Sequence, residues 1–392
     1  MIATSSRTMG LSLALLALAL PARAEDWKID PTLAIVGGVA YETIQPRAGD
    51  DREDRFYTVA LSRIGLTADL TWGLTIESEF EVNAGPHGTS VWEGQAALQV
   101  RNQAISLNKW GLRIQAGRLT DESSFDFSSA HVMDQLMTDY YTRTVLLASG
   151  FNRGNGILAS YEVVKGLRLG LTVNAGNPVS TTGALVVGGT FAPFSRVYIA
   201  PWQQVGRDAS KFPADEFDFL LITPFITYRS EFADAQASLQ LFRVNTNTAS
   251  EEDEPIDGYN VRLGARGKLL NEALRFWANW SLVQNEVVDP NDGARLSGDI
   301  FTGMTFSAGV DYDFLGKTGV GVQYALVRDQ QGLGTRTTQH YFNLGASWWV
   351  HDTTALGARF GLFMKCEEPN TGGGCPEKEG TRSYFLTLRT FL

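Results

Sequence analysis

Apolar and polar residues alternate along the segment "LTIESEFEVN", residues 74–83. Side chains of a β-strand point to opposite faces in turn, so this pattern predicts a strand with one apolar and one acidic face. Only Ser78 interrupts the apolar parity. The apolar face holds Leu74, Ile76, Phe80 and Val82, and the acidic face holds Glu77, Glu79 and Glu81.

The same two-residue period, bounded by turn residues, recurs along the whole chain and predicts sixteen strands. The apolar segment 183–194 is left inside a long connection, because a further strand there would make the count odd, and whether it is loop or strand stays open. The predicted strands are 31–41, 56–68, 73–83, 91–103, 111–118, 154–163, 167–176, 217–229, 235–246, 258–268, 273–286, 301–314, 318–328, 338–350, 353–366 and 381–392.

Short and long connections alternate between these strands. The short ones are 69–72, 104–110, 165–166, 230–234, 269–272, 315–317 and 351–352, and the long ones include 119–153 and 177–216. This alternation is typical of an outer-membrane barrel with periplasmic turns and extracellular loops. Aromatic residues lie at the turn ends, where rings settle at the level of lipid headgroups: Trp72, Trp110, Tyr228, Phe232, Phe314 and Trp349.

The sequence therefore predicts an all-β transmembrane antiparallel barrel of about 16 strands. The alternative, a secreted β-sandwich or propeller, would have to bury charged strand faces in a packed core. Lipid favours closure, because only a closed barrel satisfies the backbone groups of every strand.

The amino terminus predicts export. Arg7 precedes the apolar run 11–20 and the small-residue site 22–24, which is the pattern of a signal peptide cleaved after Ala24. The run is about half of the roughly 20 residues that a membrane-spanning helix needs, although an uncleaved anchor is the alternative. Residues 25–392 would then form one barrel domain in the outer membrane of a Gram-negative bacterium.

Charge and cysteine content narrow the function further. The formal net charge is −10 at pH 7, and an acidic chain of this kind lacks the positive charge that nucleic-acid binding requires. Cys366 and Cys375 flank a Gly-rich segment and predict a loop-stapling disulfide in an oxidising compartment. Two free thiols or a metal pair are the alternatives, but no His lies nearby.

Parity also assigns charged residues to the lumen of the predicted barrel. A barrel of about sixteen strands encloses an aqueous channel, so these side chains would line a wet wall. The long connection 119–153 is acidic, and folding inward would set its carboxylates against arginines across a constriction; the alternative is an outer loop with solvated acids. The predicted basic wall residues are Arg101, Arg113, Arg168, Arg262, Arg266 and Arg275, with Arg359 and Arg389 following the same rule. The predicted acidic residues are Glu77, Glu79, Glu81, Asp121, Glu122, Asp126 and Asp134.

These features favour a channel for passive diffusion of ions and small hydrophilic solutes, with no cofactor and no bound metal. A hydrolase embedded in the barrel would need a nucleophile beside a His base, and the four histidines are scattered: His87, His131, His340 and His351. A non-conducting structural barrel would need an apolar or plugged lumen. Acidic clusters in the outer loops are either solvated or share divalent cations with lipopolysaccharide.

Two segments carry a resemblance to a known family. "LRIQAGRLTDESSFDF", residues 112–127, and "FNRGNGILASYE", residues 151–162, resemble the phosphate-selective porin O and P family of Gram-negative bacteria. The resemblance implies a trimeric, sixteen-stranded channel in outer-membrane lipid with the third loop, 119–153, as its constriction. It also implies that the C-terminal strand contacts the barrel-assembly machinery.

The chain departs from that family in two places. The third loop is net acidic, whereas phosphate selectivity calls for basic residues at the constriction. The chain ends in "TFL", with Phe391 one residue before the end, whereas outer-membrane chains commonly end in Phe. The choice between phosphate, other anions and cations as the favoured solute therefore stays open.

Overall fold

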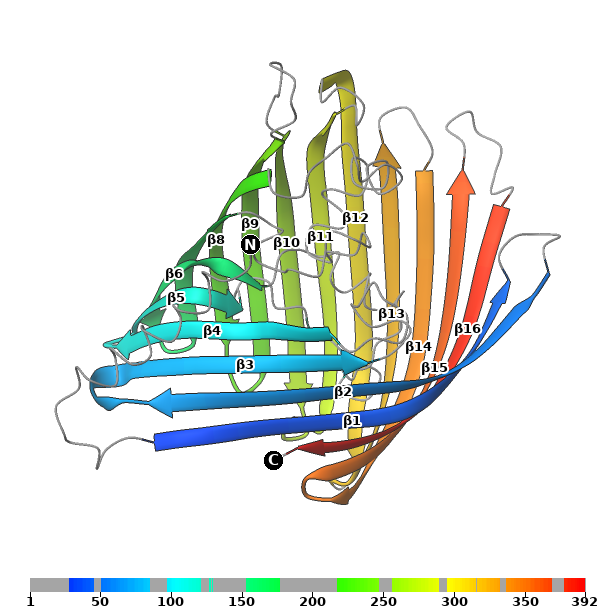
Figure 1. Cartoon of the computed structure of the whole chain (residues 1–392), viewed down its shortest axis with the longest axis horizontal. Helices are drawn as coiled ribbons and strands as arrows, with labels where there is room; N and C mark the ends of the chain where they lie inside the picture. The colour runs from blue at the N-terminus through cyan, green and yellow to red at the C-terminus, as the bar shows by residue number, and fades with distance from the viewer. Residues whose placement is uncertain are drawn as a thin grey trace, which may run out of the picture.

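A computed structural model gives the fold, and it describes residues 28–45, 51–84, 97–120, 127, 129, 153–176, 217–246, 256–288, 295–314, 316–331, 336–368 and 377–391. Sixteen antiparallel strands form one sheet, which closes where β1 pairs with β16 (Figure 1). The predicted all-β barrel and its strand number are confirmed. Within the described residues, no helix has the length and apolar character to cross a membrane.

The strands follow one another around the barrel in chain order. Their bounds are β1 (Lys28–Gln45), β2 (Glu53–Asp69), β3 (Leu74–Ala84), β4 (Ala97–Lys109), β5 (Leu112–Thr120), β6 (Arg153–Val164), β7 (Leu167–Gly176), β8 (Phe217–Arg229), β9 (Ala233–Thr246), β10 (Ile256–Leu269), β11 (Leu274–Val288), β12 (Arg295–Phe314), β13 (Thr318–Gln331), β14 (Arg336–His351), β15 (Thr354–Glu368) and β16 (Glu377–Phe391).

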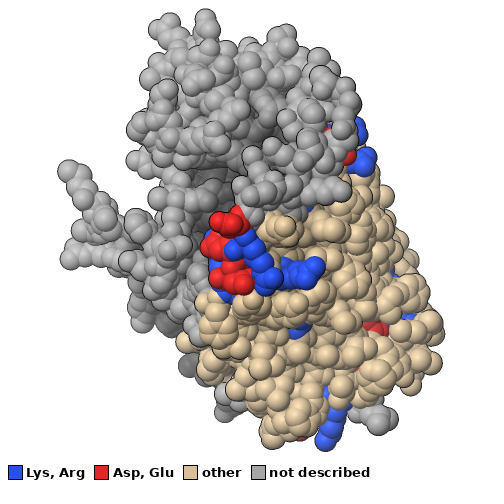
Figure 2. Space-filling view, turned by 90° about the vertical axis from the view of Figure 1, so that its right-hand side faces the viewer, with Lys and Arg blue, Asp and Glu red and all other residues tan. Residues whose placement is uncertain are grey.

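The sheet exposes apolar residues and buries polar ones, the reverse of a water-soluble protein. On β16, Leu386 and Leu388 are 56% and 50% exposed, whereas Thr387 between them is 9% exposed and Arg389 is 7% exposed. Alternation of this kind places the apolar side chains on the outer surface and the polar ones on the lumenal surface. Figure 2 shows a described surface that is mostly tan, with the largest group of charged side chains in one cluster and a few others scattered over it.

Connection lengths also divide the barrel into two ends. Short turns join β2 to β3, β4 to β5, β6 to β7, β8 to β9, β10 to β11, β12 to β13 and β14 to β15, and we call this end the turn end. The long connections, including residues 121–152 and 177–216, all leave from the opposite end, the loop end.

The prediction for β4 was wrong. The predicted strand was 91–103 with a turn at 104–110, but β4 spans Ala97–Lys109 and the turn is two residues long. The pairing with β3 shifts by one residue, since Glu79 pairs with Asn102 and Phe80 pairs with Val100. Arg101 is the extra residue of this bulge, and a bulge reverses the parity on one side of it.

Several strands extend beyond their predicted bounds at the loop end. β12 begins at Arg295 and β16 begins at Glu377, inside the predicted loops 287–300 and 367–380. Charged and turn-forming residues hid these extensions, because a strand that rises above the membrane no longer needs an apolar face. The predicted signal peptide 1–24 and the apolar segment 183–194 lie outside the described residues.

Candidate functional site

Polar side chains face the lumen on β9, β10, β11 and β12, and strand register sets them in neighbouring positions. Arg266 on β10 pairs with Asp234 on β9, and Asn279 on β11 pairs with Ser307 on β12. Residues opposite each other on adjacent strands share a face. Leu263, on the other parity of β10, is 49% exposed on the outer surface. The polar set therefore lies on the inner wall.

Phe127, from the connection between β5 and β6, lies against this wall. Its backbone N–H donates to Oδ1 of Asn279 at 3.0 Å, and its carbonyl oxygen accepts from Nδ2 of Asn279 at 2.6 Å. Nδ2 also donates to the hydroxyl of Ser307 at 3.1 Å. The guanidinium carbon of Arg266 lies 5.1 Å from the centroid of the Phe127 ring, within cation–π range. Phe127 is 2% exposed.

Ser129 makes a second contact two residues further along. Its hydroxyl donates to Oδ1 of Asp311 on β12, and Ser129 is fully buried. Asp311 also lies 3.9 Å from Nη2 of Arg275, and that guanidinium donates to Asp313 at 2.8 Å. The connection between β5 and β6 thus reaches across the lumen to β11 and β12 at two described residues.

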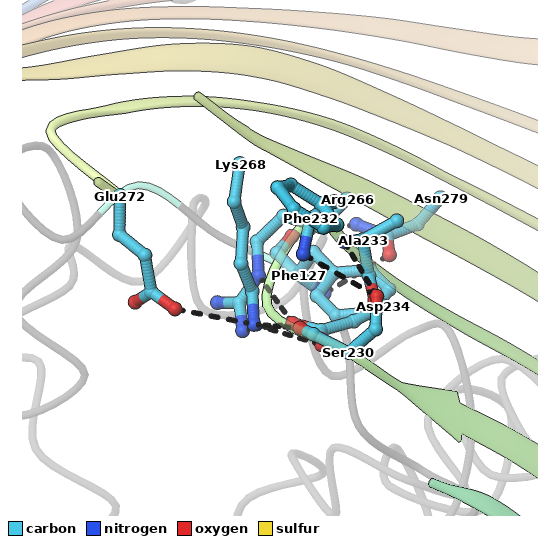
Figure 3. A network of polar contacts seen from close by, with 9 residues as sticks. All are labelled: Phe127, Ser230, Phe232, Ala233, Asp234, Arg266, Lys268, Glu272 and Asn279. Atoms are coloured by element: carbon cyan, nitrogen blue, oxygen red, sulfur yellow. Dashed lines mark hydrogen bonds and ion pairs between the residues drawn. The ribbon is translucent and has the colours of Figure 1, made fainter. Parts of the chain in front are cut away.

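A network of charges holds Arg266 in place on the side toward the turn end (Figure 3). Asp234 accepts from Nε of Arg266 at 2.9 Å, and its other oxygen lies 2.9 Å from Nζ of Lys268. Lys268 also donates to the carbonyl oxygen of Ser230 at 3.0 Å and lies 3.6 Å from Glu272. Two cations and two carboxylates are therefore grouped, so this part of the wall is close to neutral.

Other predicted basic residues lie elsewhere on the inner wall. Arg113 on β5 donates to Gln115 at 3.4 Å. Arg168 on β7 donates to Ser160 at 3.1 Å and lies 3.8 Å from a carboxylate oxygen of Glu162. These positions belong to strands that are remote from β10–β12 around the barrel.

Arg262 and the acids of β3 complete the described part of the predicted set. Arg262 is only 2% exposed, between its strand partners Ser238 and Ser281. Glu77 and Glu79 are half-buried, and a carboxylate oxygen of Glu79 lies 3.9 Å from Nε of Arg63 on β2. The acidic face of β3 therefore lies beside a basic residue of the neighbouring strand.

Some predicted residues lie outside the described part of the chain. This applies to Asp121, Glu122, Asp126, Asp134 and Cys375, and to the side chains of Glu81 and Arg101. Cys366 lies on β15 and is disulfide-bonded, and Cys375 is the other cysteine in the sequence. Among the described residues, no three His, Cys, Asp or Glu side chains are grouped so as to hold a metal ion.

Sequence reasoning missed the residues that organise this wall. Asp311 and Asp313 alternate with Tyr312 and Phe314 in a predicted strand, so parity could have placed them in the lumen. Asp234 was assigned to a turn, one residue before the predicted strand 235–246. Nothing in the sequence distinguishes Asn279 from other inward amides, because its role depends on a residue from a distant connection.

Comparison with known proteins identifies the family. A sequence profile described as Gram-negative porin matches residues 11–364 of the chain. The chain belongs to the Gram-negative porin family. No curated protein matches the sequence. The profile identifies Gram-negative porins in general and does not single out the phosphate-selective porin O and P family. Membership supports a channel rather than an enzyme.

Solved structures with the same fold agree with this assignment. The outer membrane channel DcaP of Acinetobacter baumannii has a TM-score of 0.61 at 12% identity, covering 94% of this porin and 98% of that chain. An anion-selective porin from Comamonas acidovorans has a TM-score of 0.57 at 15% identity, covering 94% and 100%. The trimer form of OmpT from Vibrio cholerae has a TM-score of 0.54 at 9% identity, covering 93% and 99%.

Fold and family together define the basic activity. This porin lies in the outer membrane and forms a channel for passive diffusion. In that setting the turn end faces the periplasm and the loop end faces the cell exterior.

Proposed function

We propose that this porin admits ions and small hydrophilic solutes through a constriction formed by its third long connection, which joins β5 to β6 and was predicted as residues 119–153, docked on β10–β12. The observation that carries the proposal is the pair of hydrogen bonds between Asn279 and the backbone of Phe127. A buried amide that satisfies both a donor and an acceptor of one residue fixes that residue in position. A connection held in this way narrows the lumen.

The charges around the docking site favour weak ion selectivity. Arg266 is paired with Asp234, and Arg275 is paired with Asp313. A cation beside a carboxylate contributes little field at a distance, because the two potentials largely cancel. The pairing of Arg266 and Arg275 therefore supports a general diffusion channel rather than a binding site for phosphate.

A second candidate function is an anion-selective channel, including selectivity for phosphate. Arg359 on β15 and Arg389 on β16 lie on lumenal parity, and the guanidinium carbon of Arg359 lies 4.1 Å from the centroid of the Phe385 ring. The Comamonas acidovorans porin, which shares the fold, is described as anion-selective. The resemblance to phosphate-selective porins points the same way.

We further propose that the chain assembles as a homotrimer and that its last strand contacts the barrel-assembly machinery. Support for the trimer comes from the trimer form of Vibrio cholerae OmpT. Support for the second contact comes from β16, which pairs with β1 to close the barrel and alternates buried and exposed residues from Thr381 to Arg389. Lipopolysaccharide and phospholipid would surround the apolar outer wall.

Planar-bilayer recording separates the two candidate functions. Single-channel conductance and the zero-current potential are measured under a KCl gradient, with and without added phosphate. A general channel gives a zero-current potential near zero and no block by phosphate. A zero-current potential near the equilibrium potential of chloride, together with block by phosphate, would instead support the anion-selective candidate. Absence of conductance from correctly folded protein would contradict both.

A further inference from the structure

Two periplasmic turns share the sequence Trp-Gly-Leu. They are residues 72–74, between β2 and β3, and residues 110–112, between β4 and β5. Both tryptophans have left-handed backbone, with φ of 76° at Trp72 and 55° at Trp110. This region disfavours residues with a Cβ, and Asn or Gly is the usual choice at such a turn position. Two tryptophans there point to a role for the rings themselves.

The two turns are packed side by side. A Cβ at Gly73 would lie 2.0 Å from the backbone oxygen of Asn108, so the first turn approaches β4 as closely as a glycine allows. Both rings remain open to the surroundings, since Trp72 is 79% exposed and Trp110 is 83% exposed. Their positions are thus fixed by the backbone while their faces stay accessible.

Lys109 lies between these rings. Its ammonium nitrogen is 4.9 Å from the centroid of the Trp72 ring and 4.6 Å from that of the Trp110 ring, within cation–π range of both. Lys109 pairs with Leu112, which is 37% exposed on the outer surface, so the lysine belongs to the outer wall. Within the described residues, no carboxylate lies within ion-pair distance of Lys109. Its positive charge is therefore not neutralised by the protein described.

Apolar side chains continue from Lys109 toward the middle of the membrane. Leu107 and Ile105, the preceding residues of the same parity on β4, are 38% and 43% exposed. Ile114 on β5 is 40% exposed beside them. The arrangement is a cation flanked by two rings at the headgroup level, with a strip of aliphatic wall above it. A phospholipid of this leaflet has the complementary arrangement, with two acyl chains that extend from an anionic phosphate toward the membrane centre.

We propose that Trp72, Lys109 and Trp110 form a binding site for one anionic phospholipid of the periplasmic leaflet. The ammonium binds the lipid phosphate, and the indoles cover the glycerol region. An anionic lipid is favoured over a zwitterionic one because the charge of Lys109 is not opposed by an amine of the lipid. The proposal rests on the outer-membrane location and not on the selectivity of the pore.

Native mass spectrometry of the folded full-length protein tests the site. The protein is equilibrated with equal amounts of phosphatidylglycerol and phosphatidylethanolamine of the same acyl chains, and the ratio of retained lipids is measured. Lys109→Gln should lower the preference for phosphatidylglycerol about fivefold, because a neutral side chain no longer distinguishes a lipid with a net negative charge from one whose amine offsets the phosphate. Trp72→Leu should also lower it. A parallel arm replaces phosphatidylglycerol with lipopolysaccharide, whose phosphates belong to the opposite leaflet.

A matched control is available at the next periplasmic turn. Lys165→Gln removes an exposed lysine from the sequence Lys-Gly-Leu, residues 165–167, which has no tryptophan. This variant should keep the wild-type lipid preference. The proposal is overturned if Lys109→Gln behaves like the wild type, if Lys165→Gln loses the preference equally, or if lipopolysaccharide is retained in place of phosphatidylglycerol. Loss of oligomers with unchanged lipid retention would identify a subunit contact instead and would also overturn it.

Conductance measured on the same samples keeps this test separate from the proposed pore function. Lys109 lies on the outer wall, so Lys109→Gln should leave single-channel conductance and zero-current potential unchanged. If the conductance measurements show anion selectivity, the proposed general-channel function fails, but the lipid-site proposal is unaffected.

Discussion

The side-chain amide of Asn279 forms two hydrogen bonds with the backbone of Phe127, a residue 152 positions earlier in the chain. The geometry reproduces the exchange of one N–H and one C=O that joins opposed residues in an antiparallel pair. Phe127 is thereby held as if it had a strand partner, although its partner is a side chain. Together with the hydrogen bond between Ser129 and Asp311, this amide holds the third long connection on the wall at the two residues of it that the structure describes.

Replacing Asn279 by leucine should weaken the docking of the third long connection on the wall. Two hydrogen bonds at about 1 kcal/mol each correspond to a shift of roughly thirtyfold toward the undocked state. Single-channel recording should then show larger and noisier conductance. Asn343→Leu, at an inward position of β14 that is 2% exposed, is the matched control and should not change the noise. Equal noise in both variants would argue that Asn279 does not hold the constriction.

Asp234→Asn should shift ion selectivity toward anions, because Arg266 and Lys268 would lose the carboxylate that neutralises them. The zero-current potential in a KCl gradient should move toward the equilibrium potential of chloride. Stability should also fall, by about 3–5 kcal/mol if the remaining charges stay buried. Glu231→Gln removes the same charge from the exposed turn nearby and should leave the potential unchanged.

The double variant Asp234→Asn with Arg266→Gln should restore the wild-type potential, since it removes one charge of each sign. A potential that stays at the value of Asp234→Asn alone would mean that Arg266 does not contribute to the field in the pore.

Leu386→Arg should destabilise the barrel in lipid by about 2–4 kcal/mol, the cost of a cation on the lipid face near the bilayer centre. Leu386 is 56% exposed, which is compatible with contact to acyl chains. Urea unfolding in lipid vesicles measures the loss, and Leu386→Met serves as the control of similar volume. A cost below about 0.5 kcal/mol would show that this residue does not face hydrocarbon.

The disulfide at Cys366 should join Cys375. Under denaturing conditions without reductant, a thiol-alkylating reagent should add no mass to the wild type and one adduct to Cys375→Ser. A closed loop of this length is worth about 2–3 kcal/mol in the chain-entropy view. Each single Cys→Ser variant should therefore lower stability as much as the double variant. Alkylation of the unreduced wild type would contradict the pairing.

Sequence periodicity predicted the strands well where the strand is regular. β7 and β8 were predicted with the bounds that the structure gives them, 167–176 and 217–229. β7 has clear apolar alternation, and both strands end beside turn-forming residues, Gly176 and Ser230. The prediction of the bounds of β4 failed because the bulge at Arg101 reverses parity inside the strand. A search for a two-residue period cannot detect an inserted residue.

Parity gives the face of a side chain but not its neighbour on the next strand. Arg266 and Arg275 were predicted on the lumenal wall, but their carboxylate partners depend on the register of β9 with β10 and of β11 with β12. A shift of two residues in either register would keep every face and change every partner. The balance of charge at the candidate constriction therefore had to come from the structure.

The pairing of β1 with β16 runs from Ala34 opposite Phe391 to Gln45 opposite Gly380. β1 therefore lacks one of its two strand partners until β16 is present. A shorter piece of the barrel leaves backbone N–H and C=O groups unpaired along two edge strands. Until that moment every intermediate carries two open strand edges, which invite aggregation in water. The topology makes completion of this barrel an all-or-none event that follows the end of synthesis and export.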